Sequence, residues 1–182
     1  MPLNRIFLLL LVILAPACGN MRDDLFPSGA DRRPAVQEGT IGPEVGQQAP
    51  DFTISDSLGN TVTLSETAPQ FRAVVLYFTM WCPICDSHMS HMRDSIIPLY
   101  PDVRFFAVDY VSGSVAAARD AQISNGYGGS PFTVLADTQQ TVLGTFHATM
   151  GTTVVIDRTG ILRMNEDFKD GTRLTQVLDA LP

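Results

Sequence analysis

The sequence predicts an α/β domain in which helices flank a central mixed β-sheet, with a β-hairpin as an N-terminal extension. Residues 73–78 form a continuous apolar run, which is typical of a strand buried on both faces. Strand-like and helix-like segments then alternate along residues 82–146, as in other α/β proteins. The chain has 182 residues, of which 45% are hydrophobic and 17% charged, so we expect one folded domain and an appendage.

Local patterns predict the individual elements. Two β-prone runs, 52–55 and 61–64, flank Leu58-Gly59-Asn60 and predict a hairpin with glycine at the turn. A strand is predicted over 72–79, and the helical spacing of apolar residues after it predicts a helix that ends near Leu99, at two prolines. The remaining predicted elements are strands at 103–109, 132–136, 152–156 and 161–165, and helices at 115–124, 138–146 and 173–181.

The first eighteen residues predict export and lipid attachment. Arg5 precedes an apolar run over 6–14, and small residues follow, so residues 1–17 have the pattern of a signal peptide. A membrane span needs about twenty apolar residues, so we expect cleavage and not a permanent signal-anchor. The string Leu14-Ala15-Pro16-Ala17-Cys18 resembles a bacterial lipobox, whose cysteine is lipidated; a removed signal peptide that ends beside Cys18 is the alternative.

The region after Cys18 predicts a tether. Residues 18–45 mix Asp, Arg, Pro, Gly and Gln without periodicity, so we expect a flexible linker there and the folded domain over 46–182. Acylation at Cys18 would place the protein on the periplasmic or cell-envelope face of a membrane without a spanning helix. The formal charge of −7 and the single lysine, Lys169, exclude the basic surface of a nucleic-acid-binding protein.

Two cysteines carry the predicted chemistry. Cys82 and Cys85 lie where the buried strand meets a helix, and a helix N-terminus stabilises a thiolate and lowers the pKa of a cysteine from about 8.5. Cys85, one turn later, can attack a mixed disulfide on Cys82. The pair predicts disulfide exchange with protein thiols and disulfides, and its own disulfide serves in place of a bound cofactor. Half of a zinc site is the alternative, but structural zinc normally needs two such pairs.

Several segments resemble one protein superfamily. Residues 74–85, Val-Val-Leu-Tyr-Phe-Thr-Met-Trp-Cys-Pro-Ile-Cys, resemble the strand and active site of the thioredoxin superfamily. Residues 45–52, 59–64 and 152–160 resemble the domain opening, first hairpin and later hairpin of its TlpA/ResA-like, AhpC/TSA-related redoxin lipoproteins. The likeness covers residues 43–182. It implies a thioredoxin-like fold, thiol-disulfide oxidoreductase activity on protein partners, and a membrane electron donor as a candidate partner.

The resemblance also implies further site residues. Trp81 and Pro83 are expected to contact the partner, with Trp81 shielding the thiolate. Where the family has a cis-proline, this chain has Gly151 after Met150, and these two residues are expected to line the opposite wall of the partner groove. A cis bond without proline costs about 2.5–4 kcal/mol, so we predict a trans bond and unusual dihedral angles at Gly151. His88 stands where the family carries a proton-transferring Glu; it can fill that role or be a solvated helix residue.

Two other functions stay open at this point. Copper-delivering Sco-type proteins share the fold and use two cysteines with a later histidine, which would be Cys82, Cys85 and His147 here, although Sco cysteines are separated by three residues. Peroxiredoxins have a threonine three residues before their reactive cysteine, as Thr79 is here, but Val75 replaces the proline of their motif. The direction of electron flow is also open, since reduction potentials in this fold run from about −270 to −120 mV.

Overall fold

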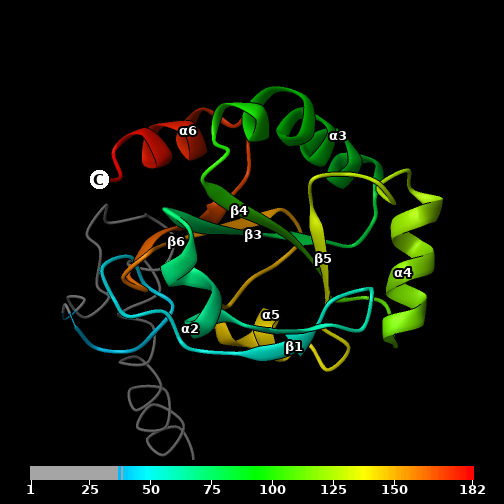
Figure 1. Ribbon diagram of the computed structural model, residues 1–182, viewed down its shortest axis with the longest axis horizontal. Coiled ribbons are helices and arrows are strands. Elements are labelled where there is room, and N and C mark those ends of the chain that lie inside the picture. Colours follow the sequence, from blue (N-terminus) through cyan, green and yellow to red (C-terminus); the bar gives the residue numbers. More distant parts are fainter. Residues whose placement is uncertain (1–36, 38) are drawn as a thin grey trace, which may run out of the picture. The chain divides into compact units, whose positions relative to one another are not determined.

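The computed structural model describes Gln37 and residues 39–182, so the predicted signal peptide, Cys18 and most of the predicted linker lie outside the described residues. In the described part, a five-stranded mixed sheet has helices on both faces, and a separate two-stranded hairpin accompanies it (Figure 1). The predicted fold class is therefore confirmed. None of the helices in these residues is long and apolar enough to span a membrane.

The predicted hairpin forms at the start of the domain. Strand β1 (Thr53–Ser55) pairs antiparallel with β2 (Thr61–Thr63), and Gly59 adopts a positive φ of 86° in the turn between them. One carboxylate oxygen of Asp56 accepts the backbone N–H groups of Leu58 and Asn60, which closes the turn. Glycine is suited to this turn because it lacks the Cβ that disfavours positive φ.

The main sheet has the strand order β5-β4-β3-β6-β7. Strands β3 (Ala73–Thr79), β4 (Val103–Asp109) and β5 (Thr133–Ala136) are parallel, whereas β6 (Thr152–Asp157) and β7 (Leu162–Asp167) are antiparallel to their neighbours. Every residue of β3 is buried, as its apolar run predicts. The β3 strand is the middle of the sheet, and its carboxyl end leads directly to the cysteines.

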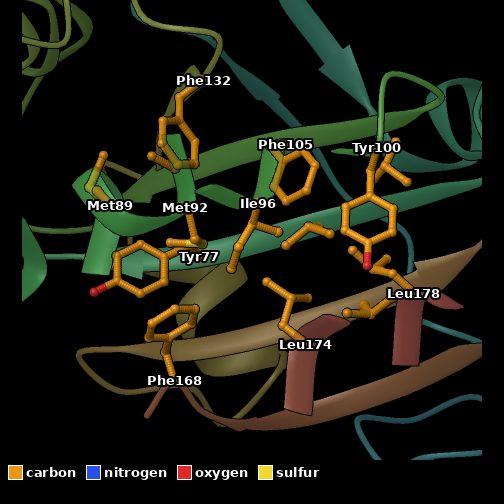
Figure 2. Close-up of a cluster of buried hydrophobic side chains, with 14 of the residues drawn as sticks. Tyr77, Met89, Met92, Ile96, Tyr100, Phe105, Phe132, Phe168, Leu174 and Leu178 are labelled. Carbon is orange, nitrogen blue, oxygen red and sulfur yellow. The ribbon is translucent and has the colours of Figure 1, made fainter. Parts of the chain in front are cut away.

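Alternate side chains of β3 enter two cores on opposite faces of the sheet. Val75 and Tyr77 point to the face that α3 (Pro83–His91) and α6 (Thr172–Asp179) cover. Figure 2 shows the Tyr77 ring beside Phe168 and Met92 in this core. The labelled members of the cluster are Tyr77, Met89, Met92, Ile96, Tyr100, Phe105, Phe132, Phe168, Leu174 and Leu178.

The second core lies on the other face. Leu76 and Phe78 pack there against residues from α2 (Leu64–Thr67) and α5 (Thr141–Thr145). Helix α4 (Val115–Ser124) packs beside β5, at the edge of the sheet. Burial on both faces holds β3 rigidly, so the residues that follow it have a fixed starting point.

The helix predicted after the cysteines differs from the structure. The helix after the cysteines was expected to continue to Leu99, but α3 ends at His91 and is followed by a π-helical turn, Met92–Ile96, and a 3₁₀ turn, Ile97–Leu99. Pro98 lies in the last turn, and proline both lacks a backbone N–H and clashes with the carbonyl one turn earlier. Regular α-helical hydrogen bonding already stops at His91, before the apolar pattern does.

Both edge strands of the sheet have backbone partners. Beside β7, Leu162 accepts the N–H of Gly46 at 2.8 Å and donates its own N–H to Gln47 at 2.9 Å. Beside β5, Val134 accepts the N–H of Ser57 at 2.8 Å. The side-chain amide of Asn165 also donates to the carbonyl of Pro43, so the last residues of the predicted linker contact the domain.

We predict that α6 contributes strongly to stability. Leu178 is fully buried in the core that contains Tyr77, so Leu178→Ala should lower the free energy of unfolding by about 2–5 kcal/mol through lost burial and a new cavity. The matched control is Gln176→Ala on the exposed face of α6, which should change it by less than about 0.5 kcal/mol. Urea denaturation measures both, and equal midpoints would show that α6 does not stabilise this core.

Candidate active site

The end of β3 places the first cysteine at a helix N-terminus. Cys82 is the N-cap residue of α3, with an extended backbone, and Pro83 occupies the first turn, where its missing N–H is not needed. The Cys82 sulfur accepts the backbone N–H of Cys85 at 3.2 Å. A thiol here takes the place of the Ser, Thr or Asp side chain that usually caps a helix, and the unpaired N–H groups favour negative charge on it.

The structure brings the two predicted cysteines together. Their Sγ atoms are 2.6 Å apart, which is well inside the van der Waals separation of two sulfur atoms. The Cys82 side chain is partly exposed, whereas Cys85 is buried on the side of α3 that faces the sheet. A partner can therefore reach one sulfur, and the second lies directly behind it.

The surroundings of Cys82 favour its thiolate. Burial raises the pKa of the Cys82 thiol, but hydrogen bonds from the Cys85 thiol and from the backbone N–H groups of Cys85 and Ile84 outweigh this effect. The pKa of Cys82 therefore lies below the ordinary value for cysteine. The thiolate is the form of a cysteine that attacks disulfides, so this environment favours the reactive form of Cys82.

Trp81 is held in an uncommon backbone conformation beside Cys82. Its φ is 59°, in the left-handed region that residues other than glycine rarely adopt. Its backbone N–H donates to the hydroxyl of Thr79 at 3.1 Å, and its indole N–H donates to a carboxylate oxygen of Asp109 at 2.8 Å. The other oxygen of this buried carboxylate accepts the backbone N–H groups of Val111 and Ser112.

Sequence reasoning missed the role of Asp109. Thr79 and Asp109 are register partners at the carboxyl ends of the parallel strands β3 and β4, so their side chains meet at the edge of the sheet where the cysteines lie. The signal that could have revealed this contact is a polar residue at the end of an apolar strand. Through it, the loop after β4 fixes the orientation of Trp81.

His88 is partly buried and lies against the core. Its Nδ1 atom is 3.0 Å from the Tyr77 hydroxyl, and its ring centroid is 4.8 Å from that of Phe168. Burial lowers the pKa of His88 below 6.5, since the charged imidazolium loses hydration there. Burial therefore favours the neutral form of the ring. Tyr77 was not predicted as a site residue, although it is the one polar ring in the apolar run of β3.

Gly151 has the conformation predicted for it. No cis peptide bond occurs in the described residues, and φ of Gly151 is 87°. Its N–H donates to the carbonyl of Phe78 and its carbonyl accepts the N–H of Phe168, so the segment is fixed between β3 and the loop after β7. Met150 packs with Trp81 and Cys82 against the core on the α3 side of the sheet. The structure thus gathers Met150 and Gly151 at the same end of the domain as the cysteines.

The ligand set for copper is not assembled. In the residues that the structure describes, no group of three or more His, Cys, Asp or Glu side chains lies close enough to hold a metal ion. His147 is exposed in the turn after α5, so the structure does not bring it together with Cys82 and Cys85. Thr79, which stands at the threonine position of the peroxiredoxin motif, accepts the backbone N–H of Trp81 with its hydroxyl.

Comparison with known families assigns the chain to one of them. A sequence model described as the AhpC/TSA family matches residues 45–165, which include β1 to most of β7 and both cysteines of the site. The chain belongs to the AhpC/TSA family. Through this family the chain also belongs to the thioredoxin superfamily, and its general activity is that of a redox oxidoreductase. No curated protein matches its sequence.

Solved structures show the same fold. A protein from Chlorobium tepidum, assigned as a thiol:disulfide interchange protein DsbE, has 23% identity and a TM-score of 0.62, over 75% of this chain and 96% of its own. MTB DsbF has 23% identity and a TM-score of 0.60, over 79% and 100%. The reduced 2-Cys peroxiredoxin of Plasmodium vivax has 18% identity and a TM-score of 0.59, over 75% and 80%. At these identities the likeness establishes that the AhpC/TSA family protein has a thioredoxin-like fold.

We predict that Cys85 lowers the pKa of Cys82. Alkylation of Cys82 by iodoacetamide should have a pH midpoint below the value of about 8.5 for a free cysteine. Cys85→Ala removes a hydrogen-bond donor to the Cys82 sulfur and should raise the midpoint, whereas Cys85→Ser keeps a donor and should raise it less. Mass spectrometry of the peptide that contains Cys82 measures the rate. The same midpoint in all three proteins would contradict this origin of the lowered pKa.

Proposed function

We propose that this AhpC/TSA family protein is a thiol-disulfide oxidoreductase of the TlpA/ResA-like type, which exchanges disulfides with protein partners through Cys82 and Cys85. One observation carries the proposal: an accessible sulfur with a stabilised thiolate lies 2.6 Å from a buried second sulfur. The Cys82–Cys85 disulfide is the redox group, and the chemistry requires no bound cofactor.

The reaction proceeds in two exchange steps, written here in the reducing direction. The Cys82 thiolate attacks a partner disulfide, a mixed disulfide forms, and one partner thiolate leaves and takes a proton from solvent. Cys85 then loses its proton and attacks the Cys82 sulfur, so that the Cys82–Cys85 disulfide forms and the second partner thiol leaves. Two electrons pass from the protein to the partner. The reverse sequence oxidises a partner dithiol.

The surface around Cys82 suits a protein partner. Met80, Ile84 and Val111 come from the segments that hold the site, and their side chains are 44%, 56% and 48% exposed. Exposed apolar side chains of this size are typical of surfaces that contact other proteins. Trp81, Pro83 and Met150 complete the proposed contact surface. The name of the Chlorobium tepidum protein, a thiol:disulfide interchange protein, agrees with disulfide exchange as the reaction.

We also propose that the protein acts outside the cytoplasm. The signal-peptide pattern of residues 1–17 and the lipobox-like string that ends at Cys18 support export and acylation. A lipid on Cys18 would hold the domain at the periplasmic or cell-envelope face of a membrane, where a membrane electron donor could reduce it.

We predict that the two cysteines have unequal roles. Cys82→Ser should reduce turnover in an insulin reduction assay to background, because no nucleophile remains at the accessible position. Cys85→Ser should form a mixed disulfide with insulin that persists until dithiothreitol is added, because the second attack is lost. The control Ser87→Ala, at an exposed position of α3, should keep wild-type turnover.

Full turnover by Cys82→Ser would refute the proposed function. Fast consumption of hydrogen peroxide with little insulin reduction would instead identify a thiol peroxidase. Stoichiometric Cu(I) retained against a chelator, and lost in His147→Ala, would identify a copper-binding protein.

We predict that Cys18 carries the membrane anchor. In bacterial cells, Cys18→Ala should move the protein from the membrane fraction to the soluble fraction, and labelled fatty acid should no longer be incorporated. Cys85→Ala, which leaves residue 18 intact, should remain in the membrane fraction. A wild-type protein that fractionates as soluble and carries no fatty acid would contradict the anchor without affecting the exchange chemistry.

A further inference from the structure

A polar cavity lies at the edge of the sheet, beside the first residues of β5. Its volume is about 370 Å³, and its walls come from the turn between β1 and β2, from β4, from α4 and from the loop that leads to β5. Figure 1 shows α4 and the β1–β2 hairpin beside β5. None of the residues of the candidate active site lines this cavity, so it is a separate feature of the domain.

Two arginine side chains line the cavity without a carboxylate partner. Arg104 comes from β4 and Arg119 from α4, and both residues are partly buried. Within the described part of the chain, neither guanidinium forms an ion pair. Arg104 donates one N–H to the hydroxyl of Thr133, and Arg119 donates one to the side-chain oxygen of Gln122. Because a guanidinium has five N–H groups, both arginines keep donors for a ligand.

One carboxylate also lines the cavity, but its oxygens are already bonded. Asp56 is 6% exposed, and one of its oxygens accepts the backbone N–H groups of Leu58 and Asn60. The other oxygen accepts the side-chain amide of Asn60, so the carboxylate is held in the hairpin turn. With two arginines and one aspartate, the lining of the cavity has a net charge of +1. An anion is therefore the ligand that this charge favours.

Buried polar side chains form part of the wall. Gln122 and Ser57 are each 5% exposed, and the Ser57 hydroxyl donates to the Gln122 side-chain oxygen at 2.6 Å. The amide nitrogen of Gln122 donates to the carbonyl of Tyr127, which fixes this wall. The Ser130 hydroxyl also lies in the lining, is buried, and has no hydrogen-bond partner among the described residues. A buried hydroxyl without a partner is unfavourable, and a ligand in the cavity would supply the missing acceptor.

We propose that this cavity binds the phosphate group of a small organic molecule. A phosphate monoester has a charge of about −1.5 to −2 at neutral pH and three strong acceptor oxygens, which suit two arginines and an unpaired hydroxyl. Arg104 and Arg119 hold the phosphate, and Ser130 donates to one of its oxygens. The cavity is larger than a phosphate ion needs, and Leu58 and Phe132 in its lining offer apolar contacts to the organic group.

Calorimetric titration with phenyl phosphate tests the proposal. All proteins carry Cys18→Ser, so that no lipid is attached. Phenyl phosphate should bind saturably, and its affinity should fall as the salt concentration rises. Phenol, which has the ring without the phosphate, should not bind, and inorganic phosphate should bind more weakly because it lacks the apolar contacts. Phenylacetate should also bind more weakly, because a carboxylate has one charge and two acceptor oxygens.

Two substitutions separate the ligand contacts from the fold. Arg119→Gln removes the charge but keeps an amide donor, and it should weaken the binding of phenyl phosphate by about tenfold or more. Ser130→Ala should also weaken binding, yet leave the urea unfolding midpoint equal or higher, since its hydroxyl has no partner in the described residues. The matched control Arg173→Gln removes the same charge from an exposed position of α6, outside the cavity, and should keep the wild-type affinity.

Three results would overturn the proposal. The first is no saturable binding of phenyl phosphate at millimolar concentrations, with or without sedimentation of the protein by phosphatidylglycerol vesicles, whose headgroup offers the same phosphate. The second is equal affinity in the wild type, Arg119→Gln and Ser130→Ala, which would place the ligand elsewhere. The third is a lower unfolding midpoint in Ser130→Ala, which would assign its hydroxyl to the fold. Each leaves the exchange chemistry of Cys82 standing, because insulin reduction tests it separately.

Discussion

The complete burial of β3 is the constraint on which the site depends. Because its alternate side chains fill two cores, the strand cannot shift along its axis without disrupting both. Its carboxyl end therefore holds Trp81 and Cys82 in one position, where α3 begins. The low pKa of Cys82 is a consequence of this placement, since the backbone N–H groups that stabilise its thiolate belong to the first turn of α3.

Much of the fold could be predicted because its elements have regular apolar patterns. The boundaries of β4 and α4 match their predicted ranges, and the site at Cys82 and Cys85 follows from their position between a strand and a helix. Periodicity could not predict the π-helical turn, Met92–Ile96, because the apolar pattern continues through it. The change from α-helical to π-helical hydrogen bonding after His91 is a property of the backbone, and no side-chain signal in the sequence marks it.

The residues that sequence reasoning missed share one property. Asp109 and Tyr77 act through contacts with residues far away in the sequence or on another element: Asp109 binds the Trp81 indole, and Tyr77 meets His88. Spacing along one helix or strand carries no information about such pairs. His88 was found because it stands where the resembling family carries a proton-transferring Glu, but its partner on β3 becomes visible only when α3 packs onto the sheet.

The backbone partners at the edges of the sheet also bear on whether sheets of different molecules can pair. An uncovered strand offers unpaired amide and carbonyl groups to any neighbouring chain, and growth of a sheet from one molecule to the next follows from such pairing. Here Leu162 on one margin and Val134 on the other already bond to this chain's own backbone. A second molecule that added a strand at Leu162 or Val134 would first have to displace these bonds.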